Sequence, residues 1–309
     1  MEKIYDVITY GRSSIDLYSQ EVGTRFEDIP GFHAFVGGSP LNIAVGCSRL
    51  GLKASLLSAV GNDKVGDFLL NFLEKEGVIS KNIPVIDGAR SSAVILGIEP
   101  PDRFPLVYYR DNCADSQISI DHVLKAGIEK SRLLEVSGTA LNIEPTRSAA
   151  FLAAEIAAKN EVPVILDLDF RADQWHDIRA FGITARAYMR NVNIVLGTEE
   201  EILAAYLTDE SQLNISHQQI SAPEIKGDIN EAINGILQLG VEALIIKTGS
   251  RGAIVYLPDG THREVPGFPV EVLNILGAGD AFAAGFIYGY LKGWEWYKCC
   301  RMGNACGAH

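Results

Sequence analysis

The sequence predicts an α/β protein in which a doubly wound, mostly parallel β-sheet carries a second, smaller β-sheet as a lid. Three observations support this fold class. Short runs rich in β-branched residues alternate with amphipathic stretches of helical period along most of the chain. Several of these runs are apolar at successive positions, as expected for parallel strands that are covered on both faces. Two further segments alternate with a period of two and contain no helix.

The predicted strands of the main sheet are short, and each ends in polar or small residues. They are YDVITYG, ASLLSAV, RLLEVSG, PVILDLD, NIVLG, EALIIKT and AIVYL. The predicted helices lie at residues 41–51, 63–76, 146–159, 199–206 and 280–292. In a sheet of this kind, ligands bind outside the carboxyl ends of the strands. We therefore expect the functional residues to follow the strands directly.

The lid is predicted from two segments, at about residues 12–36 and 91–110. These segments contain the short strands SSIDLYSQ, HAFVG, SAVILGI and PLVYYR. No internal repeat, low-complexity tract or Pro/Ser-rich linker interrupts the chain, which predicts a single domain over residues 1–309 with the lid inserted. A free edge of the lid sheet can pair with a second copy, so one expected assembly is a homodimer through the lid. The polar stretch 207–228 is predicted to be a surface loop.

The composition excludes several classes of protein. A formal net charge of -12 argues against a nucleic-acid partner, although a few arginines in a cleft can still attract an anionic small molecule. Five scattered cysteines without CxxC spacing predict free thiols in a reducing compartment. The amino terminus has no leader pattern, and no apolar run approaches about 18 residues, so we expect a cytoplasmic protein that does not span a membrane.

The strongest local signal for chemistry is the run Gly277-Ala278-Gly279-Asp280, which precedes an apolar helix. Glycines at a helix start let unpaired backbone N–H groups face an anion such as phosphate. Asp280 would repel that phosphate and is better suited to accept a proton from an attacking hydroxyl. Alternatively, Asp280 only complements the helix dipole. A dinucleotide fingerprint would need a glycine at Phe282, which disfavours a dehydrogenase, and the chain has no GxxxxGK[ST] loop.

The run GAGDAFAAGF resembles the carboxyl-terminal signature of the ribokinase-like (PfkB-type) carbohydrate kinases. The run GGSPLNIA at residues 37–44, followed by Gly51 and Gly61, is similar to the amino-terminal signature of that family in residue types and spacing. Two signatures in the family's order extend the resemblance over nearly the whole chain. The resemblance implies a three-layer α/β/α fold, ATP and Mg²⁺ as cofactors, and a small sugar as substrate.

The resemblance also implies roles for individual residues of the sugar site. Asp280 is the expected catalytic base, with backbone donors at Gly277, Ala278 and Gly279. The expected substrate-binding residues are Asp16 in the run GRSSID and, under the lid, Gly37, Gly38 and Asn42. Taken singly, the glycine pair also fits a simple turn, and Asp16 also fits a strand edge.

The nucleotide site is implied by a second set of matches. The run KTGSRG resembles a KxGxxG turn of the family, which implies nucleotide contacts from Lys247, Thr248, Gly249 and Gly252; a hairpin bend is the structural alternative. Asn304 matches a position near the adenine.

The metal site is implied by a weaker match. Glu200 matches the glutamate of the family's NxxE element and is expected to act on magnesium through water, although Gly197 replaces the usual asparagine and Leu276 replaces a hydroxyl residue before the GAGD run.

Two arginine-bearing segments bear on the substrate. Arg171 follows a predicted central strand, and Arg110 ends a lid strand next to Tyr108, which we expect to face the sugar in place of Tyr109. Two arginines can clamp a carboxylate, and this arrangement resembles the family branch that phosphorylates keto-deoxy sugar acids. The structural alternatives are salt bridges, from Arg171 to Asp167 or Asp169 and from Arg110 to Asp111 or Asp115.

Within that branch, three segments are most similar to the subgroup that forms the 6-phosphate of 5-dehydro-2-deoxygluconate in myo-inositol breakdown. They are DLDFRADQW, GTEEE and VLNILGAGDAF. The alternatives are kinases of 2-keto-3-deoxygluconate, fructose or ribose. A non-catalytic sugar or nucleotide sensor on the same fold is a rival of another class, but a sensor has no need of the base Asp280.

Overall fold

The computed structural model describes residues 2–99, 105–207, 209, 213–214, 224–271 and 276–309. A large eight-stranded sheet forms its centre. The strands of this sheet are β1 (Val7–Tyr10), β4 (Ala54–Leu57), β9 (Leu134–Ser137), β10 (Val164–Asp167), β11 (Ile194–Thr198), β14 (Ala243–Lys247), β15 (Gly252–Tyr256) and β16 (His262–Pro266). Their order is β16-β15-β14-β11-β10-β9-β1-β4, and neighbouring strands are parallel except in the pairs β14–β15 and β15–β16 at one edge, which are antiparallel. The predicted doubly wound, mostly parallel sheet is confirmed.

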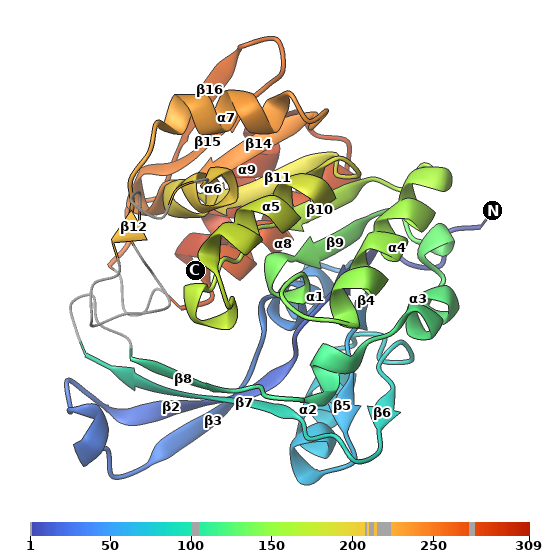
Figure 1. The fold of residues 1–309 in the computed structure, drawn as a ribbon, viewed down its shortest axis with the longest axis vertical. Helices are drawn as coiled ribbons and strands as arrows, with labels where there is room; N and C mark the ends of the chain where they lie inside the picture. The colour runs from blue at the N-terminus through green and yellow to red at the C-terminus, as the bar shows by residue number, and fades with distance from the viewer. Residues whose placement is uncertain (1, 100–104, 208, 210–212, 215–223, 272–275) are drawn as a thin grey trace.

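Helices cover both faces of this sheet (Figure 1). One face carries α3 (Ile120–Ala126), α4 (Thr146–Lys159), α5 (Ile178–Met189), α6 (Glu199–Tyr206) and α7 (Ile229–Leu237). The other face carries α1 (Ser39–Arg49), α2 (Lys64–Lys75), α8 (Ala278–Leu291) and α9 (Trp296–Ala308). The buried apolar residues accordingly form two clusters, one on each side of the sheet. The sheet strands read as continuous apolar runs because both of their faces are buried.

The lid is a separate four-stranded sheet that extends from the large sheet at the lower left of Figure 1. Its strands are β2 (Ser14–Val22), β3 (Phe32–Gly37), β7 (Ser92–Ile98) and β8 (Leu106–Tyr109), in the order β3-β2-β7-β8. The central pair, β2 and β7, is parallel, and the two outer pairs are antiparallel. All four strands fall within the predicted lid segments.

The predicted helix bounds agree with the structure to within about two residues, but some elements were not predicted. The sequence analysis does not predict the helices α3, α5 and α7 or the strand β16. A short parallel pair also joins β5 (Val60–Gly61) to β6 (Val85–Ile86). The prediction of a loop over 207–228 was wrong in part, because β12 (Leu213–Asn214) pairs with β13 (Glu224–Ile225). Strands of two residues are too short to show a period of two.

Glu135 is an acidic side chain in the interior of the large sheet. It lies on β9 between Thr9 of β1 and Ile165 of β10, and it is fully buried. Neither of its carboxylate oxygens has a hydrogen-bond partner among the described residues. Burial raises the pKa of Glu135 well above its ordinary value, and the nearby carboxyl groups of Asp167 and Asp280 act in the same direction. The folded protein therefore favours the protonated form of this carboxyl group more than the unfolded chain does.

We predict that Glu135→Gln is more stable than the wild type at pH 8 and about equally stable at pH 4. The folded pKa is raised, so the wild type loses stability as the pH rises above the pKa of the unfolded chain, whereas glutamine does not ionise. The gain at pH 8 should be about 1 to 3 kcal/mol in the free energy of unfolding, measured by urea denaturation at both pH values. Glu155→Gln, on an exposed position, is the control. A gain that is the same at both pH values would contradict the assignment.

Candidate functional site

The charged residues of the candidate site follow neighbouring parallel strands at the carboxyl edge of the large sheet. The Nζ atom of Lys247, at the end of β14, lies 2.9 Å from Oδ1 of Asp167, at the end of β10. The hydroxyl of Ser137, at the end of β9, donates to Oδ2 of Asp169 at 3.0 Å. Burial alone would raise the pKa of Asp169, but the guanidinium groups of Arg171 and Arg12 bring it below its ordinary value. The sheet edge thus holds ionised groups of both signs in a buried setting.

The helices α1 and α8 add the predicted base and its partner to this edge. A Cβ atom placed on Gly46 would lie only 2.7 Å from Cβ of Ala284, so the two helices approach closely there. One turn towards the start of each helix, Nδ2 of Asn42 donates a hydrogen bond of 2.7 Å to Oδ2 of Asp280. Asn42, predicted to bind the substrate, therefore also holds the carboxylate of Asp280 in place.

The electrostatic surroundings of Asp280 suit a proton acceptor. Burial, assisted by the negative charge of Asp169, raises the pKa of Asp280 to about 6. The hydrogen bond from Asn42 and the positive charge of Lys247 oppose this rise. A carboxylate with a pKa near 6 is ionised at neutral pH and is more basic than an ordinary aspartate. Asp280 can therefore accept a proton under physiological conditions.

The start of α8 forms an open site for an anion. Gly277 precedes the helix in the left-handed region at φ 80°, and among the described residues no side chain caps the helix. The first backbone N–H groups of a helix lack partners within the helix and carry the positive end of its dipole. The Nζ atom of Lys247 lies 3.5 Å from the position that a Cβ atom on Gly279 would take. Backbone donors and one ammonium group thus converge beside Asp280, while Asn274 and Ile275 of the preceding run lie outside the described residues.

The glycine pair at the end of β3 leaves room for the carboxylate of Asp16. A Cβ atom on Gly37 would lie 2.1 Å from that carboxylate, and one on Gly38 would lie 2.3 Å from the backbone oxygen of Arg12. Gly38 also has φ 102°, which favours glycine. The hydroxyl of Ser14 donates to Oδ1 of Asp16 at 2.7 Å. The two glycines are therefore required because the lid, the helix and the chain at Arg12 approach closely here. A simple turn would not by itself require both of them.

The two predicted clamp arginines each have an acidic partner in the structure. Arg110 Nε donates to Asp115 at 2.7 Å, and its Nη1 group donates to Thr139 and Gln174. Arg171 forms an ion pair of 2.8 Å with Asp169. Both salt bridges were among the structural alternatives considered from the sequence. Their partners hold both guanidinium groups in fixed positions near the site.

The register of the lid assigns its two tyrosines to opposite faces. Val94 of β7 pairs with Asp16 on one side and with Tyr108 on the other, so Tyr108 shares a face with Asp16. Tyr109 points to the opposite face, where 58% of its surface is exposed. The charge of Arg171 acts on both Tyr108 and Asp16. The predicted choice of Tyr108 agrees with this register.

The residues predicted for the nucleotide have clear structural roles. Thr248 and Gly249 lie in the connection between β14 and β15, and Gly252 begins β15 at φ 103°, with no room for a Cβ atom beside Val265. This connection is the hairpin bend considered as the alternative. Asn304 in α9 is buried and donates to the backbone oxygens of Val265 and Pro266. Contacts from these residues to a nucleotide stay a prediction.

The first turn of α6 separates two neighbouring glutamates. Glu200 is exposed, whereas Glu201 accepts hydrogen bonds from the backbone N–H groups of Phe170 and Thr198 at 3.2 and 2.8 Å. Glu201 is not among the residues predicted from the sequence. The pattern that could have indicated it is the capping box that it forms with Thr198. A Cβ atom on Gly197 would lie 2.9 Å from a methyl carbon of Leu168, the end of a flexible side chain that would have to shift.

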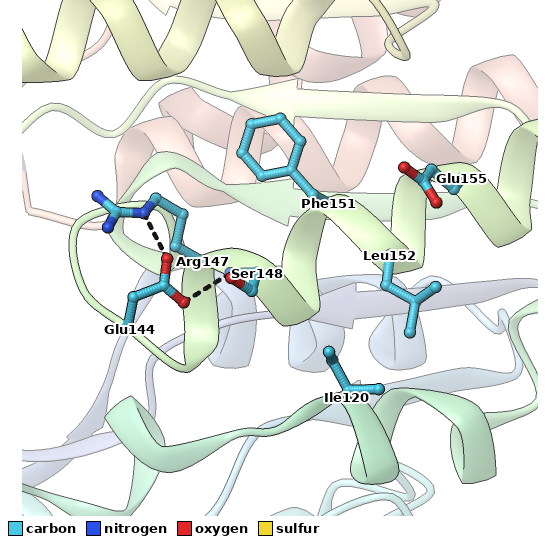
Figure 2. Close-up of a pocket in the computed structure, with 7 residues that line it drawn as sticks. All are labelled: Ile120, Glu144, Arg147, Ser148, Phe151, Leu152 and Glu155. Carbon is cyan, nitrogen blue, oxygen red and sulfur yellow. Dashed lines mark hydrogen bonds and ion pairs between the residues drawn. The ribbon is translucent and has the colours of Figure 1, made fainter.

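A surface hollow of about 470 Å³ lies apart from these residues (Figure 2). It lies between α3 and α4 and is lined by Ile120, Glu144, Arg147, Ser148, Phe151, Leu152 and Glu155. None of these follows a strand of the large sheet, and the ion pair of Glu144 with Arg147 at 2.9 Å occupies its polar end. The charged groups of the candidate site therefore lie at the carboxyl edge of the large sheet and not in this hollow. Within the described ranges, no helix has both the length and the apolar character needed to cross a membrane.

A family model described as "pfkB family carbohydrate kinase" matches residues 5–309. The chain therefore belongs to this family of carbohydrate kinases, as the two sequence signatures predicted. It is 35% identical over 308 residues to a 5-dehydro-2-deoxygluconokinase of Clostridium tetani, covering 99% of this chain and 87% of that protein. A protein of the same name from Clostridium perfringens is 30% identical, covering 98% of this chain and 86% of its own.

Solved structures support the same fold. The crystal structure of a PfkB protein from Polaromonas is 25% identical, with a TM-score of 0.81 over 99% of this chain and 95% of that chain. An uncharacterized sugar kinase from Pyrococcus horikoshii, in complex with ATP, is 26% identical, with a TM-score of 0.80 over 98% of this chain and 91% of that chain. The predicted ribokinase-like fold is confirmed.

Proposed function

We propose that this kinase transfers the γ-phosphoryl group of ATP to a hydroxyl of a keto-deoxy sugar acid, forming the 6-phosphate of 5-dehydro-2-deoxygluconate. The observation that carries the proposal is the open first turn of α8, where Asp280 is held by Asn42 beside Lys247. A base next to an anion site is the arrangement that phosphoryl transfer to an alcohol needs. The names of the relatives at 30 to 35% identity support the choice of this sugar acid.

The residues present fit ATP and Mg²⁺. The backbone N–H groups of Gly277, Ala278 and Gly279 are suited to the transferred phosphoryl group, because no side chain in the described part of the chain caps the helix. The nucleotide is assigned to Lys247 and to the turn that follows it. The exposed carboxylate of Glu200 is free to act through water on the metal, whereas Glu201 is engaged by backbone donors. When bound, Mg²⁺ neutralises the charge on the phosphate oxygens.

The sugar acid is assigned to the space between the lid and the sheet edge. Asp16 accepts hydrogen bonds from sugar hydroxyls, and Tyr108 covers the ligand from the same face of the lid. Arg110 and Arg171, which their acidic partners hold in place, act on the carboxylate. Asp280 accepts the proton of the attacking hydroxyl. Closure of the lid excludes water, which would otherwise accept the phosphoryl group.

The first test is a coupled ADP-release assay with Mg-ATP and four substrates. We expect the highest kcat/KM for 5-dehydro-2-deoxygluconate, then 2-keto-3-deoxygluconate, with fructose and ribose at least about tenfold lower, because the arginines favour a carboxylate. Preference for a neutral sugar would leave the kinase activity in place and contradict the sugar-acid assignment. The absence of ATP turnover with any sugar would favour the sensor.

A second prediction concerns Asp280 as the base. We expect kcat to fall about tenfold per pH unit below about pH 6 and to level off above it, because a protonated carboxyl group cannot accept a proton and the pKa of Asp280 is about 6. Asp280→Asn should lower kcat by about 10² to 10⁴ and leave ATP binding intact. Stopped assays from pH 5 to pH 8 measure both effects. Asp121→Asn, on an exposed position of α3, is the control. Near-normal turnover of Asp280→Asn would rule out the base.

We also propose that the lid forms a homodimer. The lid face opposite Asp16 is largely apolar, and the register brings together Leu17, Ile95 and Val107 along one row. On this face Val107 is 40% exposed and Tyr109 is 58% exposed. A contiguous apolar sheet face of this kind favours burial against a second copy.

Sedimentation velocity tests the homodimer. The wild type should sediment as a dimer at micromolar concentration, and Val107→Glu should shift it towards the monomer, because the substitution buries a charge in the interface. Val85→Glu is the matched control, because Val85 is also exposed, at 52%, but lies outside the lid. A monomeric wild type, or an equal shift in both variants, would contradict a dimer through the lid.

We propose the cytoplasm as the compartment, where ATP is available and thiols stay reduced. All five cysteines are free, and four of them are buried. A net charge of -12 supports small-molecule partners over nucleic acid.

A further inference from the structure

Arg12 is a buried arginine at the junction of the large sheet and the lid. It lies in the connection between β1 and β2, and 7% of its surface is exposed. Its Nη1 group donates a hydrogen bond of 2.8 Å to the hydroxyl of Ser14. Its guanidinium group lies over the ring of Tyr108, 5.4 Å from the centroid. Nε is buried and has no hydrogen-bond partner among the residues that the structure describes. Arg12 thus contacts the lid strand that carries Asp16 and the tyrosine that faces the site.

The charge of Arg12 lacks the close partner that the other site arginines have. Arg110 and Arg171 form ion pairs of 2.7 and 2.8 Å with their own carboxylates. Within the described part of the chain, Arg12 forms no ion pair within 4.0 Å. Asp16 is the acidic residue with the strongest influence on it, and the hydroxyl of Ser14 stands between the two side chains. Asp16 and other acidic groups nearby outweigh the effect of burial and raise the pKa of Arg12, so the guanidinium group stays charged and attracts an anion that reaches it.

We propose that Arg12 binds the carboxylate of the sugar acid and determines the preference of this kinase for acids over neutral sugars. The proposal rests on the proposed function and deepens it. The ring of Tyr108 covers one face of the planar guanidinium group, so a ligand meets its N–H edge, the edge that matches a carboxylate.

The link through Ser14 gives this binding a geometric consequence. Arg12 donates to Ser14, and Ser14 donates to Asp16, so the guanidinium group and the hydroxyl-binding carboxylate are fixed relative to one another. A sugar acid that contacts both has its carboxylate and its hydroxyls recognised at a set separation. A neutral sugar can contact Asp16 but has no carboxylate to bind Arg12. The site therefore favours the acid over the neutral sugar.

The test compares Arg12→Met and Arg12→Lys with the wild type, on 5-dehydro-2-deoxygluconate and on fructose. Methionine keeps an apolar chain over Tyr108 and removes the charge. We expect Arg12→Met to raise the KM for the sugar acid by about 10 to 100-fold, the worth of a charged hydrogen bond. The KM values for ATP and fructose should change by less than about threefold. Arg12→Lys should recover part of the affinity for the acid, because it keeps the charge without the fork.

Arg186→Met is the matched control. Arg186 also lies over a tyrosine ring, that of Tyr206 at 5.9 Å, but on the α5 and α6 side of the sheet. The Arg186→Met variant should have the same KM for the sugar acid, for fructose and for ATP as the wild type. Melting temperatures of all variants show whether each one folds. If Arg12→Met does not fold, the milder Arg12→Lys is compared with the wild type in its place.

The outcomes separate this proposal from the proposed function. A wild type that takes the sugar acid, with a KM that neither Arg12 variant changes, would overturn the role of Arg12 alone. An equal rise in KM for the acid and for fructose would make Arg12 a structural residue and overturn the proposal as well. A wild type that phosphorylates only neutral sugars would overturn the sugar-acid function, and the role of Arg12 with it, before any variant is compared.

Discussion

The close packing of α1 against α8 is the contact on which the candidate site depends. Gly46 and Ala284 let the two helices approach, and one turn away Asn42 reaches the carboxylate of Asp280. Helices advance about 5.4 Å per turn, so the small residues and the hydrogen bond lie in adjacent layers of one interface. A larger side chain at Gly46 would separate the helices and move Asp280 away from Asn42. Packing in the core and the position of the Asp280 carboxylate are thus one constraint.

The second feature of the site is the balance of buried charges at the carboxyl edge of the sheet. Asp167 is paired with Lys247, and Asp169 with Arg171. Arg171 keeps Asp169 ionised in this buried region, whereas burial raises the pKa of Asp167 to about 7 even with Lys247 beside it. The incomplete balance around Asp280 leaves its pKa at about 6, a value that suits a base at neutral pH. The local arrangement of charges, more than the net charge of -12, sets the chemistry.

The lid is joined to this edge by close backbone contacts. Gly37 makes room for Asp16, and Gly38 lies against the backbone of Arg12, so β2, β3 and α1 meet where the substrate is expected. The same glycines that resemble a family signature are therefore required by steric contact in this chain. At Gly37 the carboxylate of Asp16 occupies the space that a side chain would fill.

The elements and motifs that have a local sequence pattern can be predicted from the sequence alone. Continuous apolar runs predicted the parallel strands, a period of two predicted the lid, and the GAGD run marked the start of α8. Only the tertiary structure decided how these parts meet. Asn42 and Asp280 are 238 positions apart. The ion pairs that Arg110 and Arg171 each form with a carboxylate, and the lack of such a pair at Arg12 among the described residues, leave no periodic pattern in the sequence. Contacts between distant segments depend on how helices and strands pack, and local patterns carry no record of that packing.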